Sequence, residues 1–228
     1  GRVTSGRLFR CGQMADLTGA GRQHIIDLGV ETICDLRFPE EREGDPTPFP
    51  MQLPRRMEVP MDPGSAVALR GALGNTELTP EDRRRFMREI YRELAVEHVD
   101  AYRRVFDALL ETADGGFLVH CTAGKDRTGL AAAFIQRVLG VSEADATDDY
   151  LLTNETIDFE GFILPRWRAN NPQVTLADVK ALSGVRSSYL QTAFTAIDEE
   201  FGSFAGFVSD GLRLTTDQRR LLNDRYLD

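Results

Sequence analysis

The sequence predicts an α/β fold in which a small, mostly parallel central sheet is flanked by many helices. Short apolar segments at 8–12, 30–36 and 117–120 have the composition of strands. Longer segments between and after them repeat apolar residues at helical spacing. Strands mixed with helices along a chain are typical of α/β layer folds. The 228 residues fit one domain, so we expect 1–228 to form a single unit.

The first third of the chain adds one helix, two loops and a further strand at 57–61. The helix is expected from Thr18, a good N-cap, to Gly29, a good C-cap. Residues 39–56 are rich in proline and charge, which predicts a loop. Residues 64–78 are mostly small and show little periodicity, which predicts a second loop.

The rest of the chain predicts helices around the central strand. Residues 79–82 (TPED) are a strong helix start, because they supply an N-cap, a first-turn proline and acids at the positive end of the helix dipole. A second helix is expected over 99–110. Further helices are expected at 128–140, 142–154, 175–182, 187–200, 203–210 and 216–226.

Composition excludes several classes of protein. A hydrophobic content of 42% and a charged content of 28% are ordinary for a soluble globular protein. The net charge of −9 argues against a general nucleic-acid surface. No apolar run approaches the ~20 residues that span a bilayer. We find no signal peptide, so we expect a cytoplasmic protein or one secreted without a recognisable signal. Three cysteines form no even disulfide framework, which indicates a reducing compartment.

The chemistry is expected in the loop that follows the strand at 117–120. A strand, a tight loop and a helix start bring backbone N–H groups into one concavity, which is an anion site. The positive field favours the thiolate form of Cys121 at the start of the loop, and Arg127 at its end can grip two phosphate oxygens. Gly124 permits a left-handed turn. The anion is expected to contact Thr122, Ala123, Gly124, Lys125, Asp126 and Arg127.

The string HCTAGKDRTG at 120–129 resembles the signature of cysteine-dependent protein tyrosine phosphatases. In its fuller form it is similar to the bacterial tyrosine/serine phosphatase family, which also has an Asp-Leu-Arg string followed by a glutamate. Residues 35–37 and Glu41 match that second pattern. The resemblance implies a tyrosine-phosphatase-like fold and hydrolysis of phosphomonoesters. It also implies a phosphate or sulfate ion in the loop of a crystal.

In this interpretation Cys121 attacks phosphorus and forms a cysteinyl-phosphate, which water then hydrolyses. Arg127 and the loop N–H groups stabilise the three equatorial oxygens, so we expect no metal and no cofactor. Thr128 either donates to the Cys121 sulfur or only caps the helix. His120 is expected to shape the loop through backbone bonds, with direct proton transfer as the less favoured role.

The leaving oxygen needs a proton from a nearby acid. The resemblance favours Asp126, within the loop, and Asp62 on an earlier loop is the alternative. Lys125 either adds positive charge at the mouth, which in this family suggests highly anionic substrates, or is a solvated loop lysine. Asp35 and Arg37 are expected to pair and brace the loop.

A helical lid at about 155–186 is implied by the resemblance, with an ordinary amphipathic helix on the core as the equal alternative. Phe159, Phe162 and Trp167 would shield the thiolate, and Arg166 or Arg168 would meet phosphate.

The two remaining cysteines leave a further alternative open. Cys34 or Cys11 could protect Cys121 as a disulfide, but a small buried side chain is the favoured role for each.

The expected function is therefore a metal-independent phosphomonoester hydrolase. Phosphotyrosine proteins are the leading substrates, and phosphoserine/threonine proteins and phosphoinositides are further candidates. Two other interpretations stay open: a rhodanese-like sulfurtransferase, disfavoured by the Arg127-Thr128 pair, and a non-catalytic phosphate-binding module, disfavoured by the intact Cys121, Asp126 and Arg127.

Overall fold

A computed structural model describes residues 1–48, 54–62 and 78–228 of the chain. Its centre is a four-stranded sheet in the order β1-β4-β2-β3, in which all neighbouring strands are parallel. The strands are β1 (Leu8–Cys11), β2 (Val30–Asp35), β3 (Arg55–Glu58) and β4 (Gly116–His120). The expected α/β fold is confirmed. The loop predicted at 64–78 lies outside the described residues except for its last residue.

The register of the sheet places the end of β4 between two other strand ends. His120 pairs with Cys11 of β1 on one side and with Asp35 of β2 on the other. The N–H of Leu36, just past β2, donates to the carbonyl of His120 at 2.9 Å. The loop after His120 therefore begins at the carboxyl edge of the sheet, where parallel α/β folds commonly bind ligands.

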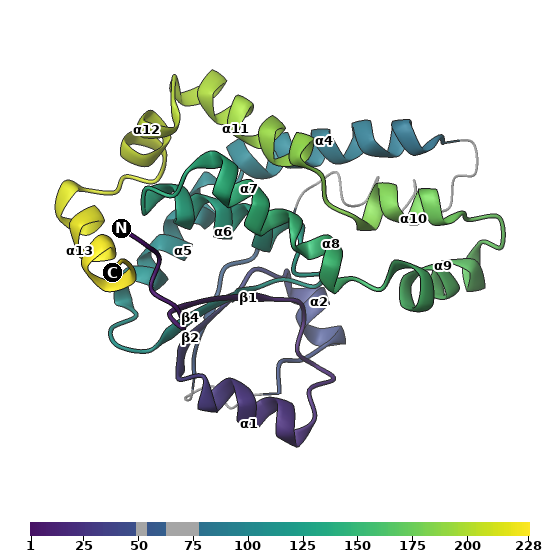
Figure 1. The fold of residues 1–228 in the computed structure, drawn as a ribbon, viewed down its shortest axis with the longest axis horizontal. Helices are drawn as coiled ribbons and strands as arrows, with labels where there is room; N and C mark the ends of the chain where they lie inside the picture. The colour runs from purple at the N-terminus through teal and green to yellow at the C-terminus, as the bar shows by residue number, and fades with distance from the viewer. Residues whose placement is uncertain (49–53, 63–77) are drawn as a thin grey trace.

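Helices cover both faces of the sheet, which explains why β4 is buried along its whole length. Helix α1 (Gly19–Asp27) lies on one side, over a small core of Met14, Val30, Ile33 and Leu118. The larger core lies on the other side (Figure 1). It is built with α4 (Pro80–Val96), α5 (Val99–Glu111), α6 (Asp126–Val138) and α11 (Ser187–Phe201).

The remaining elements pack around this framework. They are α2 (Pro39–Gly44), α7 (Glu143–Leu151), α8 (Thr153–Thr156), η1 (Phe159–Ile163), α9 (Leu164–Asn170), α10 (Leu176–Ser183), α12 (Phe204–Gly206), η2 (Phe207–Gly211) and α13 (Thr216–Tyr226). The termini lie side by side, and Val3 bridges Leu227 (Figure 1). Among the described residues, no helix is both long and apolar enough to cross a membrane.

Three predictions of element type or extent were wrong in detail. The loop predicted at 39–56 contains α2, because Pro39 begins the helix and Glu40 and Glu41 sit at its positive end. The same segment also contains the start of β3, which covers Arg55–Glu58 rather than 57–61. The helix predicted at 142–154 is divided into α7 and α8.

Two glycines of the motif have steric reasons for their presence. Gly124 has φ +67°, and a Cβ on it would lie 2.6 Å from the backbone of Cys11. A Cβ on Gly129 would lie 2.8 Å from the ring of Tyr150. Real Cβ atoms do not approach other atoms so closely, so the first glycine lets the loop turn against β1 and the second lets α7 pack on α6.

Candidate active site

The loop between β4 and α6 forms a nest of free backbone N–H groups. Among the described residues, no acceptor takes the N–H groups of residues 122–127. The carbonyl of Thr122 is turned away from the nest and accepts the N–H of Gln13 at 2.9 Å, which ties the loop to the end of β1. Free N–H groups at a helix start bind anions. Cys121 is a free thiol at the start of this nest and is 2% exposed.

A bidentate ion pair with Glu41 fixes Arg127. Its Nη1 and Nη2 donate to the two Glu41 carboxylate oxygens at 2.7 and 2.8 Å. Nη1 also reaches the carbonyls of Leu36 and Met61 at 3.3 and 3.2 Å. Its Nε–H has no acceptor within the described chain, so this N–H and the second proton on Nη2 are left for an oxyanion. The guanidinium is therefore fixed by Glu41 and still has N–H groups to bind an oxyanion.

Glu41 joins three parts of the site. It accepts from Arg127, from the Thr122 hydroxyl and from the Phe38 N–H at 3.2 Å. Burial would raise the pKa of its carboxyl, but the bonds and charge of Arg127, with the bonds from Thr122 and Phe38, together lower the pKa. The sequence matched Glu41 to the family pattern but assigned it no role; its position after Asp-Leu-Arg was the only signal.

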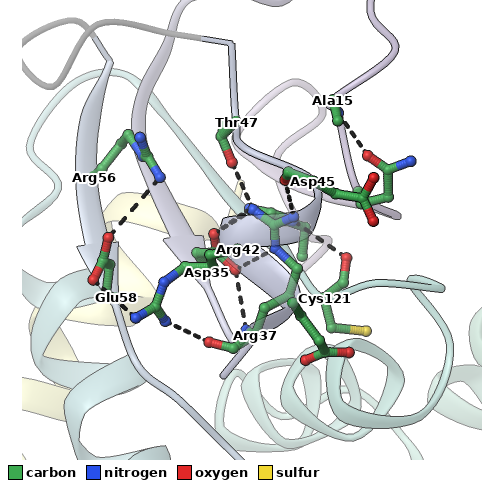
Figure 2. A network of polar contacts seen from close by, with 12 residues as sticks. Ala15, Asp35, Arg37, Arg42, Asp45, Thr47, Arg56, Glu58 and Cys121 are labelled. Atoms are coloured by element: carbon green, nitrogen blue, oxygen red, sulfur yellow. Dashed lines mark hydrogen bonds and ion pairs between the residues drawn. The ribbon is translucent and has the colours of Figure 1, made fainter. Parts of the chain in front are cut away.

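A buried polar cluster supports the loop from the neighbouring strand (Figure 2). Arg37 is fully buried and its Nε and Nη2 donate to the Asp35 carboxylate at 2.9 and 2.8 Å. Arg37 also donates to the Thr47 hydroxyl at 2.7 Å and to the Asp45 carbonyl at 2.6 Å. Burial would raise the pKa of Asp35, but the bonds from Arg37, with the charges of His120 and Arg37, together lower the pKa. The pair lies at the end of β2, outside residues 122–127.

His120 is buried between this cluster and the loop. Its Nδ1 lies 3.3 Å from the Cys121 carbonyl, so Nδ1 carries the proton. Its Nε2 lies 3.5 Å from an Asp35 oxygen and makes no hydrogen bond within the described chain. Burial lowers the pKa of His120 to about 4, against the opposing effect of Asp35. A neutral ring that bonds the loop backbone favours the shaping role.

Asp126 begins α6 and is held from behind by a tyrosine of α4. The Tyr91 hydroxyl donates to Asp126 Oδ1 at 2.7 Å. Asp126 Oδ2 lies 3.4 Å from the Lys125 ammonium. The carboxyl keeps 21% of its side-chain surface exposed, which leaves it open to a bound molecule.

The structure contradicts the expectation that Lys125 is a solvated loop lysine. Lys125 is only 7% exposed, and its Nζ donates to the carbonyl of Leu182 near the end of α10. The carbonyls of the last helical turn are unpaired within the helix and attract cations, which explains the burial. Its charge is therefore shared between α10 and Asp126.

The second candidate acid, Asp62, is exposed at the edge of a described segment. Its neighbour Met61 contacts Arg127 through its carbonyl. The negative charge of Asp62 also acts on His98, whose pKa is nevertheless lowered by burial. Asp62 is therefore next in sequence to a residue that contacts Arg127, whereas Asp126 belongs to the loop itself.

The bond expected from Thr128 to the Cys121 sulfur is not formed in this structure. The Thr128 hydroxyl is fully buried and finds no partner among the described residues. A buried hydroxyl without a partner is uncommon and costs stability. Among the hydroxyl side chains of α6, that of Thr128 is the nearest in sequence to the loop. It can donate a hydrogen bond to an acceptor that enters the site.

All three cysteines are free thiols. Cys11 pairs in register with His120 and packs in the small core under α1. Burial, and then the charge of Cys121, raise its pKa to about 12. Cys34 is fully buried in the large core, and burial raises its pKa. Both have the environment of small core residues.

The segment expected to form a lid is anchored at its far end. Helix α10 is bound to α4 through the ion pair of Arg83 Nε and Asp178 Oδ1 at 3.1 Å, and to the loop through Lys125. Elements η1 and α9 share a small core with Val174 and with Val179 of α10, and Trp167 of α9 also packs against the large core.

The lid arginines have local partners, and the three aromatic residues differ in exposure. Arg166 lies 3.5 Å from the Phe162 ring centre, and Arg168 donates to the Val174 carbonyl at 3.0 Å. Phe162 is 51% exposed, whereas Phe159 and Trp167 pack against the small core. The described residues show no contact of these arginines with the loop.

The fold and the residues of the loop define a protein of the cysteine-dependent phosphatase class. Comparison with known proteins supports the same class. A model of the tyrosine phosphatase family matches residues 1–228. A candidate tyrosine-protein phosphatase of Cupriavidus necator is 33% identical over 96% of this chain and 79% of its own length. The triple specificity protein phosphatase PtpB of Mycobacterium tuberculosis is 28% identical over 90% of this chain and 85% of its own length.

The chain therefore belongs to the tyrosine phosphatase family. It is a protein tyrosine phosphatase, which hydrolyses phosphomonoesters. These relatives do not favour the sulfurtransferase or the non-catalytic binding module. Among the described residues, no group of three or more His, Cys, Asp or Glu side chains is placed to hold a metal ion.

The depressed pKa of His120 predicts a specific loss of stability in acid. Between its ordinary value of 6.5 and about 4, the unfolded chain binds a proton at this residue and the folded protein does not. Stability should therefore fall as pH falls through this window, by roughly 2 to 3 kcal/mol between pH 7 and 4.5. Urea unfolding at each pH measures this effect. The free energy of unfolding should depend less on pH in His120→Gln than in wild type, and exposed His24→Gln is the control. Equal slopes in all three proteins would contradict the assignment.

The Glu41 ion pair predicts that a residue with no direct role at the phosphorus affects the rate through Arg127. Glu41→Gln keeps the shape but removes the charge that holds Arg127, so kcat/KM for 4-nitrophenyl phosphate should fall by about 10-fold or more. Glu40→Gln, the exposed neighbour on α2, is the matched control and should keep wild-type activity. Wild-type kcat/KM in Glu41→Gln would show that the pair is not needed.

Proposed function

We propose that Cys121 is the nucleophile of a metal-independent phosphomonoesterase that forms a cysteinyl-phosphate. The observation that carries the proposal is the nest of residues 122–127, whose N–H groups have no acceptor among the described residues. Arg127 stands at the end of the same loop with its guanidinium fixed by Glu41. A fixed set of donors around a thiol stabilises charge on equatorial phosphoryl oxygens without a metal.

The reaction runs in two steps. The thiolate of Cys121 attacks phosphorus, the bond from phosphorus to the leaving oxygen breaks, and that oxygen takes a proton from an acid. Water then attacks the cysteinyl-phosphate, the sulfur–phosphorus bond breaks, and phosphate leaves. The Thr128 hydroxyl, unpaired among the described residues, can donate to the departing sulfur. His120 shapes the loop, and Asp35 and Arg37 brace it from below.

Asp126 is the proposed acid in the first step and the base in the second. It lies within the loop and keeps part of its carboxyl exposed. Asp62 is the alternative acid, supported by its exposure beside the Met61 contact with Arg127.

The leading substrates are phosphotyrosine proteins, as expected for this family. The name of the Mycobacterium tuberculosis relative includes triple specificity, which supports more than one substrate class. Phosphoserine/threonine proteins and phosphoinositides are therefore included in the proposal, with free phosphate or sulfate as loop ligands. We infer that 1–228 acts as a single domain with a lid segment at about 155–186, whose helix α10 is bound to the loop through Lys125. The chain works in a reducing compartment or after export.

Turnover of a phosphotyrosine peptide in the presence of a chelator tests the proposal. Wild type should release phosphate at an unchanged rate, and Cys121→Ser should release none because the serine hydroxyl is a far weaker nucleophile than a thiolate. Cys11→Ala is the matched control and should stay active under reducing conditions. Phosphoserine peptides and phosphoinositides, run in parallel, rank the substrate classes.

The proposal fails if a chelator stops turnover and added metal restores it. It also fails if Cys121→Ser keeps its activity.

A further inference from the structure

Two buried tyrosines stand behind Asp126 in a short chain of hydrogen bonds. The Tyr91 hydroxyl of α4 lies 2.7 Å from Asp126 Oδ1. The Tyr150 hydroxyl of α7 lies 2.6 Å from the Tyr91 hydroxyl. Tyr91 is fully buried and Tyr150 is 1% exposed. The chain therefore links three helices, α6 through Asp126, α4 through Tyr91 and α7 through Tyr150.

The direction of this chain follows from chemistry. An ionised carboxylate only accepts hydrogen bonds, so Tyr91 donates to Asp126. Its single proton is then used, and the Tyr150 hydroxyl donates to the Tyr91 oxygen. Burial raises the pKa of both phenols well above the ordinary range, so both stay protonated donors at neutral pH. A charge-assisted bond from a buried phenol is among the stronger side-chain hydrogen bonds.

The two oxygens of Asp126 are therefore not equivalent. Oδ1 is occupied by Tyr91, and Oδ2 lies 3.4 Å from the Lys125 ammonium. When the carboxyl is protonated, Tyr91 still fills Oδ1 and the acid proton is placed on Oδ2. We propose that Tyr91 is a positioning residue, which fixes the Asp126 carboxyl and presents the Oδ2 proton to the leaving oxygen; this rests on the proposed role of Asp126 as the acid.

In the first step every bond and proton is accounted for. The sulfur–phosphorus bond forms as the bond to the leaving oxygen breaks, and that oxygen takes the proton from Oδ2. Asp126 is left as a carboxylate, which Tyr91 stabilises through Oδ1. Tyr150 keeps Tyr91 in this orientation by donating to its oxygen.

The tyrosine rings have a packing role that is separate from the hydroxyl. The Tyr91 ring lies 6.2 Å from that of Tyr150 and 5.5 Å from that of Tyr189, centre to centre. Tyr91→Phe keeps the ring and removes only the hydroxyl, so the core is retained. The variant therefore tests the hydrogen bond and not the packing.

The experiment compares two aryl phosphates whose leaving groups differ in their need for a proton. Phenyl phosphate releases a strongly basic phenolate, whereas 4-nitrophenyl phosphate releases one that departs without protonation. The ratio kcat/KM reports the step in which this group leaves. In Tyr91→Phe we expect kcat/KM for phenyl phosphate to fall by about 10-fold, with less than about a twofold change for 4-nitrophenyl phosphate. A purely structural role would lower both equally.

Three further variants separate this inference from the proposed function. Asp126→Asn should show the same selectivity with a larger loss, about 100-fold for phenyl phosphate. In Asp126→Asn, adding Tyr91→Phe should cause no further selective loss. Tyr226→Phe removes a buried hydroxyl that bonds the Leu109 carbonyl at 3.2 Å, far from the acid in sequence, and should resemble wild type.

The outcomes are distinct. A selective loss in Asp126→Asn but none in Tyr91→Phe overturns the positioning role and leaves the proposed function intact. No selective loss in Asp126→Asn overturns the acid assignment and the inference together, and Asp62→Asn should then show the loss instead. Equal losses on both substrates in Tyr91→Phe reduce Tyr91 to a structural residue and overturn the inference.

Discussion

The ion pair between Glu41 and Arg127 is the interaction on which the site depends. It joins α2 to the start of α6, and Thr122 ties the loop to the same carboxylate. A partly buried ion pair offsets its desolvation cost best when its geometry is good and the carboxylate lone pairs are satisfied. Here the carboxylate accepts from three partners, while Arg127 keeps its Nε–H free. The pair therefore holds the guanidinium in place and leaves one of its N–H donors for the substrate.

A second layer keeps this arrangement rigid. The buried Asp35–Arg37 pair fixes the end of β2, and His120 at the end of β4 bonds the backbone of the loop. A bound phosphoryl group then meets donors that need not reorganise during the reaction, which is the main source of electrostatic catalysis. Behind the opposite end of the loop, the tyrosine of α4 orders the carboxyl of Asp126.

The sequence predicted the local part of this account and missed the long-range part. The string at 120–129 specifies a strand end, a turn that needs Gly124, and a helix start, because each depends on neighbouring residues. The partner of Arg127 could not be predicted, because Glu41 lies 86 residues away and is brought near by the order of the strands. The burial of Lys125 depends on where the end of α10 packs, which no local pattern determines. Proline and charge at 39–44 predict a loop, whereas the structure places Pro39 at the first position of a helix, where proline is favourable.

The most direct test of the central claim is to trap the covalent intermediate. Wild type would be mixed with a phosphotyrosine peptide, quenched in acid within milliseconds, digested, and analysed by mass spectrometry for a phosphorylated cysteine. The account predicts one phosphoryl group on the peptide that contains Cys121, formed before phosphate is released, and none in Cys121→Ser. Phosphate release with no phosphorylated Cys121 at any quench time, or a phosphoryl group on another residue, would contradict it.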